Sequence, residues 1–195
     1  MKSNRYINGI MTLNNKRLFF AVVLAPSTKH QIEEWREHSL AYLNQPIVKS
    51  DNLHITLAFL GQCNTQQIAA LVDIGNKVSA EQFSLTFNQL HFWQKPKILC
   101  LAPSKVPSQL TELQQQLANR VAELGFESHH SQYKPHITLV RKIKHFTEAR
   151  TSDVTFQINC TQFALYESHH EEVHGNHHKQ KSGVVYTPLY TWDLL

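Results

Sequence analysis

Two histidine–threonine pairs are the residues of this sequence whose types and spacing best suit catalysis. The tetrapeptide His54-Ile55-Thr56-Leu57 returns in the second half of the chain as His136-Ile137-Thr138-Leu139. In a β-strand, successive side chains alternate between the two faces, so the His and Thr of each copy would share one face, opposite the Ile and Leu. Two such strands facing each other would place two imidazoles and two hydroxyls around one site.

This set of groups suits chemistry on a phosphoester. An unperturbed imidazole titrates near pH ~6.5, so a neutral ring can accept a proton from water while a charged ring protonates a leaving oxygen. Each of these roles contributes roughly 10²–10⁴-fold in rate. Threonine hydroxyls can donate hydrogen bonds to phosphoryl oxygens, where negative charge is concentrated in the transition state. For either copy taken alone, a purely structural strand remains an open alternative.

The elements that would position these pairs follow from the surrounding pattern. Turn-forming residues precede both copies, at 49–52 and at 132–135, which favours two equivalent strand starts. The apolar run 18–24 predicts a buried central strand. We expect helices from Pro26 to about Asn44, from the cap at Asn64-Thr65 to about Val78, and from Pro107 to Gly125. Further strands are expected at 83–87, at 90–93 and 98–101 with a turn between them, at 154–165 and at 184–189. This order predicts an α+β fold with mainly antiparallel sheets.

The composition bounds the class of protein. The 195 residues are 42% hydrophobic and 17% charged, as in a folded globular chain, and no apolar run approaches the ~20 residues that span a bilayer. Residues 1–16 form a polar N-terminal extension without the apolar segment of a secretory signal, before one domain at 17–195. The odd set of widely spaced cysteines, without a paired motif, favours a reducing cytoplasm. The net charge of +4 mildly favours an anionic partner.

The two His-x-Thr-x motifs resemble the signature of the two-histidine phosphoesterases, and within them the RNA 2′,3′-cyclic phosphodiesterases, also called 2′-5′ RNA ligases. The segments that carry the resemblance are 17–21, 51–61, 135–139 with Arg141, 165–168, and 186–189 with Trp192. The resemblance implies two pseudo-symmetric lobes that form a central cleft, with helices on the outside. It also implies hydrolysis of RNA 2′,3′-cyclic phosphate ends to 2′-phosphates, without metal or cofactor. RNA ends or 2′,3′-cyclic nucleotides would be the partners of a cytoplasmic monomer, and reversible 2′-5′ ligation is a possible second reaction.

The resemblance also assigns roles to individual residues. His54 and His136 would be catalytic, and we assign His136 as base and His54 as acid, although the near-symmetry of the motifs leaves the reverse order open. Thr56 and Thr138 would hold the non-bridging oxygens, and Arg141 would bind the phosphate. A straight strand points Arg141 away from His136, so this role requires a bulge or the end of the strand; a solvated arginine is the alternative.

Two further sets of residues are less specific. Phe20 and Tyr133 are candidates for stacking on the terminal base, although Phe20 fits a core position equally well. The segment His169-His178 is rich in histidine and glutamate and contains the formal His-Glu-x-x-His pattern of zinc proteases at His170–His174. Its polar context and Gly175 argue against a zinc-binding helix, so we expect a solvated loop without a resident metal. A metal-binding protein that uses this loop remains the alternative function.

Overall fold

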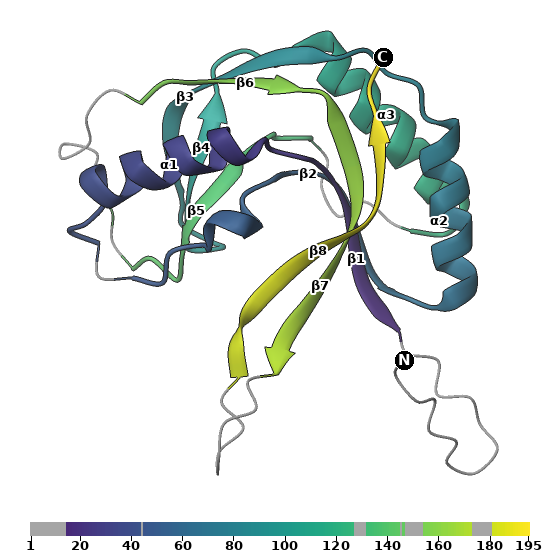
Figure 1. Ribbon diagram of the computed structural model, residues 1–195, viewed down its shortest axis with the longest axis horizontal. Coiled ribbons are helices and arrows are strands. Elements are labelled where there is room, and N and C mark those ends of the chain that lie inside the picture. The colour runs from purple at the N-terminus through teal and green to yellow at the C-terminus, as the bar shows by residue number, and fades with distance from the viewer. Residues whose placement is uncertain (1–14, 44, 127–131, 145, 147–153, 173–180) are drawn as a thin grey trace.

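Two four-stranded antiparallel sheets form the framework of the protein (Figure 1). The structure is a computed structural model that describes residues 15–43, 45–126, 132–144, 146, 154–172 and 181–195. The first sheet has the order β2-β1-β7-β8 and the second the order β5-β4-β3-β6. The predicted α+β fold with antiparallel sheets is therefore confirmed. β1 begins at Lys16, and residues 1–14 of the polar extension lie outside the described part.

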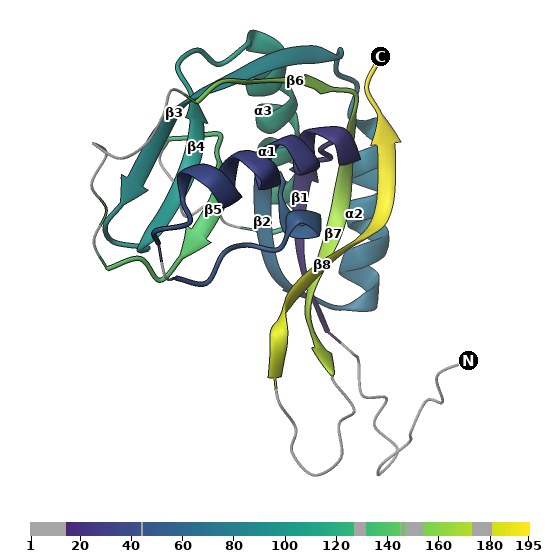
Figure 2. The same cartoon turned by 60° about the vertical axis from the view of Figure 1, so that its left-hand side comes forward.

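The elements follow one another so that chain segments from both ends build the first sheet, while the middle of the chain builds the second. In chain order they are β1 (Lys16–Val22), α1 (Pro26–Ser39), the short 3₁₀ helix η1 (Ser50–Asn52), β2 (Ile55–Cys63), α2 (Thr65–Lys77), β3 (Phe83–Trp93), β4 (Ile98–Pro103), α3 (Ser108–Glu123), β5 (Ile137–Arg141), β6 (Phe156–Cys160), β7 (Gln162–Glu172) and β8 (Lys181–Asp193). The β7–β8 hairpin extends away from the rest of the fold (Figures 1 and 2).

The two motif strands occupy equivalent places. β2 is an edge strand of the first sheet and β5 an edge strand of the second. His54 directly precedes β2, and His136 directly precedes β5. Each sheet therefore presents one histidine at the start of an edge strand, as expected for two pseudo-symmetric lobes.

The helices cover the sheets and share one apolar core with them. Trp35 of α1 packs edge-on against Phe156 of β6, with ring centroids 5.8 Å apart. α3 packs against β2, and α2 packs against both α3 and β8. Gly75 allows α2 to approach β8 closely, because a Cβ at this position would lie 2.2 Å from the ring of Trp192. Buried side chains of both sheets belong to one continuous cluster, which joins the two lobes into a single packed body.

Most of the predicted elements are present. Asn64 caps α2 through a capping box with Gln67, as its position predicts. α1 ends at Ser39, earlier than expected, and the following residues form turns before Pro46. The segments expected at 83–87 and 90–93 form one strand, β3. No helix in the described ranges is long and apolar enough to cross a membrane.

Candidate active site

Backbone carbonyls orient both motif histidines in the same way. The His54 Nδ1 lies 2.7 Å from the carbonyl oxygen of Asn52, and the His136 Nδ1 lies 2.8 Å from that of Lys134. A carbonyl oxygen only accepts hydrogen bonds, so Nδ1 carries the hydrogen in each ring. In a neutral ring the lone pair is then on Nε2. In His54 this Nε2 lies 3.0 Å from the Thr56 hydroxyl, which can donate to it.

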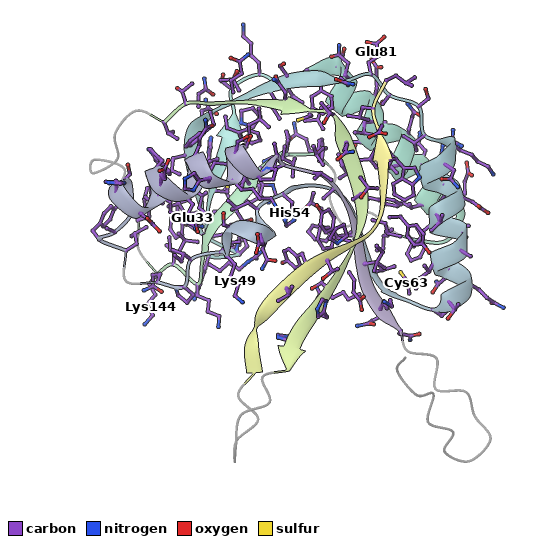
Figure 3. The ribbon with its side chains drawn as sticks, viewed as in Figure 1. Glu33, Lys49, His54, Cys63, Glu81 and Lys144 are labelled. Carbon is purple, nitrogen blue, oxygen red and sulfur yellow. The ribbon has the colours of Figure 1, made fainter. Side chains whose placement is uncertain are left out.

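An aromatic surface surrounds His54. Its ring centroid lies 4.9 Å from that of Phe19 and 5.1 Å from that of Tyr186, whose ring stands nearly perpendicular at 87°. Phe19 stacks in turn on Tyr166, at 5.3 Å. These rings, with Ala21, lie on the face of the first sheet opposite the main core, which we call the site face. Figure 3 shows His54 near the centre of the molecule, beside η1.

The electrostatics of His54 link the two lobes. Burial lowers the pKa of His54 to about 4, and the hydrogen bond from its ring to the Asn52 carbonyl acts in the opposite direction. Positive charges on His136, Arg141 and Lys29 lower this pKa further. Each of these three groups therefore lies close enough for its charge to act on the His54 ring. The site residues that the sequence places far apart in the chain are electrostatically coupled around one imidazole.

A bulge in β5 explains how Arg141 takes part in this coupling. In the pairing with β4, Thr138 lies opposite Cys100 and Val140 lies opposite Leu99, so Leu139 is an extra residue. The extra residue reverses the alternation, so Arg141 shares a face with His136 and Thr138. Arg141 is exposed, whereas both Leu139 and Val140 are completely buried. The bulge that the role of Arg141 requires is therefore present.

An additional extended segment holds this bulge from outside the sheet. The Val48 amide donates to the Leu139 carbonyl at 2.9 Å, and the Arg141 amide donates to the Pro46 carbonyl at 3.2 Å. Arg36 of α1 is 2% exposed, and its Nη1 donates to the Val48 carbonyl at 2.6 Å. A buried guanidinium thus fixes the segment that pairs with the motif strand.

The two residues predicted to stack on a base have other environments. Phe20 is 0% exposed and packs against Phe163 and Trp192 in the core, so the predicted stacking role is wrong and its packing alternative is confirmed. Strand alternation turns the neighbouring Phe19, not Phe20, toward His54. Tyr133 is partly buried, and its hydroxyl donates to the Thr56 carbonyl at 3.1 Å. It bridges the turn before the second motif and the first motif strand.

Sequence reasoning missed several neighbours of the histidines. Trp93, interpreted as a packing residue, lies against His136 with ring centroids 4.5 Å apart. The Asn52 side chain is buried and binds β8, accepting from the Tyr186 amide and donating to the Val184 carbonyl. Asn52 lies within segment 51–61, which carries the family resemblance, but its contact with β8 is evident only from the structure.

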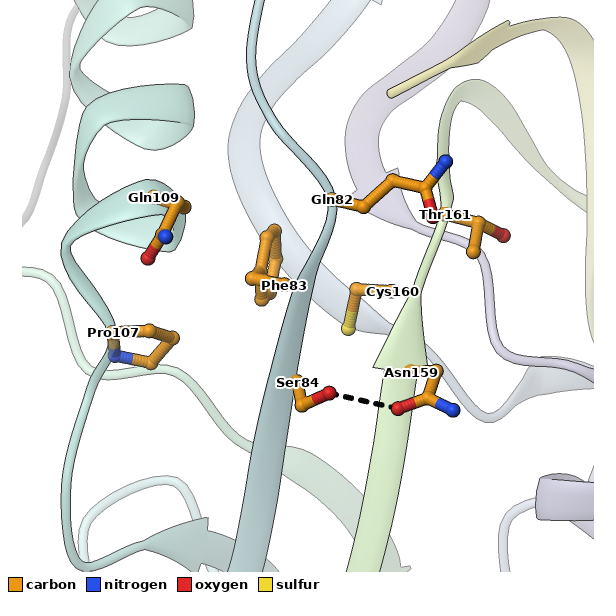
Figure 4. Close-up of a pocket in the computed structure, with 8 residues that line it drawn as sticks. All are labelled: Gln82, Phe83, Ser84, Pro107, Gln109, Asn159, Cys160 and Thr161. Carbon is orange, nitrogen blue, oxygen red and sulfur yellow. Dashed lines mark hydrogen bonds between the residues drawn. The ribbon is translucent and has the colours of Figure 1, made fainter. Parts of the chain in front are cut away.

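Other candidate sites lie away from the histidines. His169 and His170 lie in β7, whereas residues 173–178 of the histidine-rich segment lie outside the described part of the chain. Within the described ranges, no group of three or more residues could hold a metal ion. An open hollow of about 490 Å³ lies between the start of α3 and strands β3 and β6 (Figure 4). It includes Cys160, whose pKa burial raises to about 12, and none of the predicted site residues.

Known proteins share this sequence and arrangement. An RNA 2′,3′-cyclic phosphodiesterase of Escherichia coli is 29% identical over 180 residues, which cover 92% of this chain and 97% of that protein. The crystal structure of E. coli LigT complexed with 3′-AMP has a TM-score of 0.81 at 28% identity and covers 93% of this chain. The match covers 99% of that LigT chain. A second crystal structure, of a phosphoesterase, has a TM-score of 0.80 at 30% identity, and the match covers 93% of this chain and 99% of that one. The family model of the 2′-5′ RNA ligase superfamily matches residues 24–171. The chain belongs to the 2′-5′ RNA ligase superfamily.

Proposed function

We propose that this protein hydrolyses RNA ends that carry a 2′,3′-cyclic phosphate and leaves a 2′-phosphate, by acid–base catalysis without a metal ion. The observation that carries the proposal is the coupled pair His54 and His136, each held through Nδ1 by a backbone carbonyl. The names of the Escherichia coli, Bacillus subtilis and Archaeoglobus fulgidus relatives, all RNA 2′,3′-cyclic phosphodiesterases, support the same reaction.

We keep the order of roles expected from the resemblance, with His136 as the base that activates water and His54 as the acid that protonates the leaving 3′-oxygen. Burial and nearby positive charges lower the pKa of His54 to about 4 in the protein without substrate. A phosphate anion beside the ring favours the imidazolium, so substrate binding would supply the charged His54 that this role requires. In the reaction, the water oxygen bonds to phosphorus, the bond from phosphorus to the 3′-oxygen breaks, and the 3′-oxygen gains a proton.

The remaining site residues would stabilise the phosphoryl group. In this proposal Arg141 would place a permanent positive charge beside the phosphoryl group, and a guanidinium suits phosphate because its donors form a rigid fork. Thr56 would exchange its hydrogen bond to the His54 Nε2 for one to a non-bridging oxygen, and Thr138 would donate a hydrogen bond to the other non-bridging oxygen. The leaving 3′-oxygen would take the place of the Thr56 hydroxyl at Nε2.

The same site would support 2′-5′ ligation in principle. If the 5′-hydroxyl of a second RNA end replaces water, its oxygen bonds to phosphorus while the bond to the 3′-oxygen breaks. The product is a 2′-5′ phosphodiester, and the energy of the strained cyclic ester replaces that of a nucleoside triphosphate. Because water is abundant, we expect hydrolysis to exceed ligation unless both ends are bound.

The test uses the purified protein, a 2′,3′-cyclic nucleotide and excess EDTA, with the product identified by ³¹P NMR. We expect turnover to a 2′-phosphate, and we expect His54→Ala and His136→Ala each to lower kcat by roughly 10²–10⁴-fold. His91→Ala is the matched control, because His91 is an exposed histidine on β3 that contacts Gln89. Loss of turnover in EDTA, or full activity of His54→Ala, would refute the mechanism.

A further inference from the structure

Trp93 lies on the same side of the second sheet as His136. In the antiparallel pairing Trp93 is opposite Ile98 of β4, and Ile98 is opposite Arg141 of β5. Directly opposed residues of neighbouring strands project their side chains from one face, so Trp93 shares the face of His136 and Arg141. Trp93 is partly exposed, and its ring centroid lies 4.5 Å from that of His136. A large aromatic surface is therefore available beside this histidine.

The role of His136 in the proposed mechanism determines what can lie on that surface. His136 is the base, so the oxygen that attacks phosphorus lies beside its Nε2. In an in-line displacement the leaving 3′-oxygen departs on the opposite side, where His54 protonates it. Any larger group attached to the attacking oxygen therefore extends toward His136 and Trp93. Water carries no such group, whereas the 5′-hydroxyl of a second RNA end carries a whole nucleotide.

Two lysines lie at the same end of the second sheet as Trp93. Lys97 ends the turn that follows β3, and Lys142 directly follows β5. The two connections are joined, because the Ile143 amide donates to the Lys97 carbonyl at 3.0 Å. Both lysines are exposed, and neither 82–111 nor 128–147 contains an aspartate or glutamate. This end of the sheet therefore offers positive charge to the phosphates of an RNA strand.

The backbone conformation of these two lysines is unusual. Lys97 has a φ of 55° and Lys142 a φ of 61°, and among the described residues other than glycine only these two have a positive φ. The left-handed conformation crowds a Cβ atom, so glycine and asparagine occupy it more readily than lysine does. Local folding preference does not explain a lysine at either position. The ammonium group is what lysine adds there.

We propose that Trp93, Lys97 and Lys142 form a binding site for a second RNA end, the one that carries a 5′-hydroxyl, which we call the acceptor site. The terminal base of this end stacks on Trp93, and its following phosphates contact the two lysines. The proposal rests on the proposed function and makes the second RNA end a bound substrate of ligation. In the joining step the 5′-oxygen bonds to phosphorus and gives its proton to His136. The bond from phosphorus to the 3′-oxygen breaks, and His54 protonates that oxygen.

The experiment mixes a short RNA that ends in a 2′,3′-cyclic phosphate with increasing amounts of an acceptor RNA that begins with a 5′-hydroxyl. A gel separates the joined RNA from the 2′-phosphate product of hydrolysis, and a second acceptor lacks its first base. With the unmodified protein, half-maximal joining should need roughly ten-fold more of the abasic acceptor, because one stacked base contributes about this factor. Trp93→Ala should remove this preference, whereas Trp93→Phe should keep it. The preference compares two acceptors on one protein, so an effect of Trp93→Ala on His136 cancels.

Lys97→Asn and Lys142→Asn give an independent measurement. Each removes a charge but introduces a residue that favours the left-handed conformation, so urea unfolding should find each variant at least as stable as the unmodified protein. The logarithm of the acceptor concentration at half-maximal joining should depend less steeply on the logarithm of salt concentration, by about 0.7 for each lost phosphate contact. Lys105→Asn is the matched control, because Lys105 is exposed and follows the opposite end of β4.

An unchanged preference for the complete acceptor in Trp93→Ala, or unchanged salt slopes in both lysine variants, would overturn the acceptor site. Hydrolysis of the cyclic phosphate without joining at any acceptor concentration would also overturn it. In each of these cases the proposed hydrolysis would stand. If the unmodified protein hydrolysed no cyclic phosphate, the proposed function would fail, and the acceptor site with it.

Discussion

Protonation of His54 should cost the folded protein stability as the pH falls from about 6.5 to about 4. Burial, and then the charges of His136, Arg141 and Lys29, lower the pKa of His54 to about 4, whereas an unfolded histidine titrates near ~6.5. In this window the unfolded chain binds the proton and the folded chain does not. The stability that His54 contributes is therefore complete above the unfolded pKa and is lost as the pH falls toward the folded pKa. At about 1.4 kcal/mol per pKa unit, the loss is at most about 3 kcal/mol.

Urea unfolding between about pH 7 and about pH 4.5 measures this loss when the protein is compared with His54→Asn. The asparagine side chain can still donate to the Asn52 carbonyl, but it does not titrate. All other histidines titrate in both proteins, so the difference between the two pH profiles isolates His54. We expect the unmodified protein to lose up to about 3 kcal/mol more than the variant over this range.

Equal losses in the two proteins would refute the reasoning, because they would mean that His54 binds its proton equally well in both states. NMR titration of the ring supplies the direct check, and a midpoint near 6.5 would have the same consequence. Inorganic phosphate should raise the midpoint, since a bound anion favours the imidazolium. A midpoint that does not respond to saturating phosphate would place the anion away from this ring.

Three further variants test how the site is held. Tyr133→Phe should lower the free energy of unfolding by about 1–2 kcal/mol in urea and raise KM, because it removes the bridge to the first motif strand. Arg36→Met should cost about 1–3 kcal/mol by leaving the buried Val48 carbonyl without its donor, and unchanged stability would contradict this. Gly75→Ala should destabilise the protein by about 1–3 kcal/mol, because the new methyl group overlaps Trp192, while Ala at the exposed Gly183 should not.

Local signals predicted much of the fold. The apolar run of β1 and the N-cap of α2 at Asn64 depend on neighbouring residues, and the sequence predicts both. The end of α1 was placed too late, because residues 40–43 continue an apolar pattern that tertiary packing uses in turns instead. The aromatic residue that faces His54 was also misjudged. Side chains alternate between the two faces of β1, but every residue in this run is apolar. The sequence therefore does not show which of Phe19 and Phe20 faces the core and which faces His54.

The sequence shows that a phosphate-binding role for Arg141 requires a bulge or the end of the strand, but it does not show that the bulge lies at Leu139. The alternation of β5 conflicts with a role for Arg141, and only pairing with two other segments settles the conflict. β4 skips Leu139, and Val48 satisfies the Leu139 carbonyl. Neither partner is adjacent in the chain, so the feature that turns Arg141 toward the site is a property of the assembled edge.

The two identical tetrapeptides lie in different surroundings. In both copies the imidazole is oriented by a carbonyl two residues earlier, and a carbonyl is present whatever the side chain, so Asn52 and Lys134 serve equally well. Their side chains differ in effect, because Asn52 is buried against β8 while Lys134 is exposed. His54 therefore lies in an enclosed setting that disfavours its charged form. The lowered pKa of His54 therefore comes from residues outside the repeat.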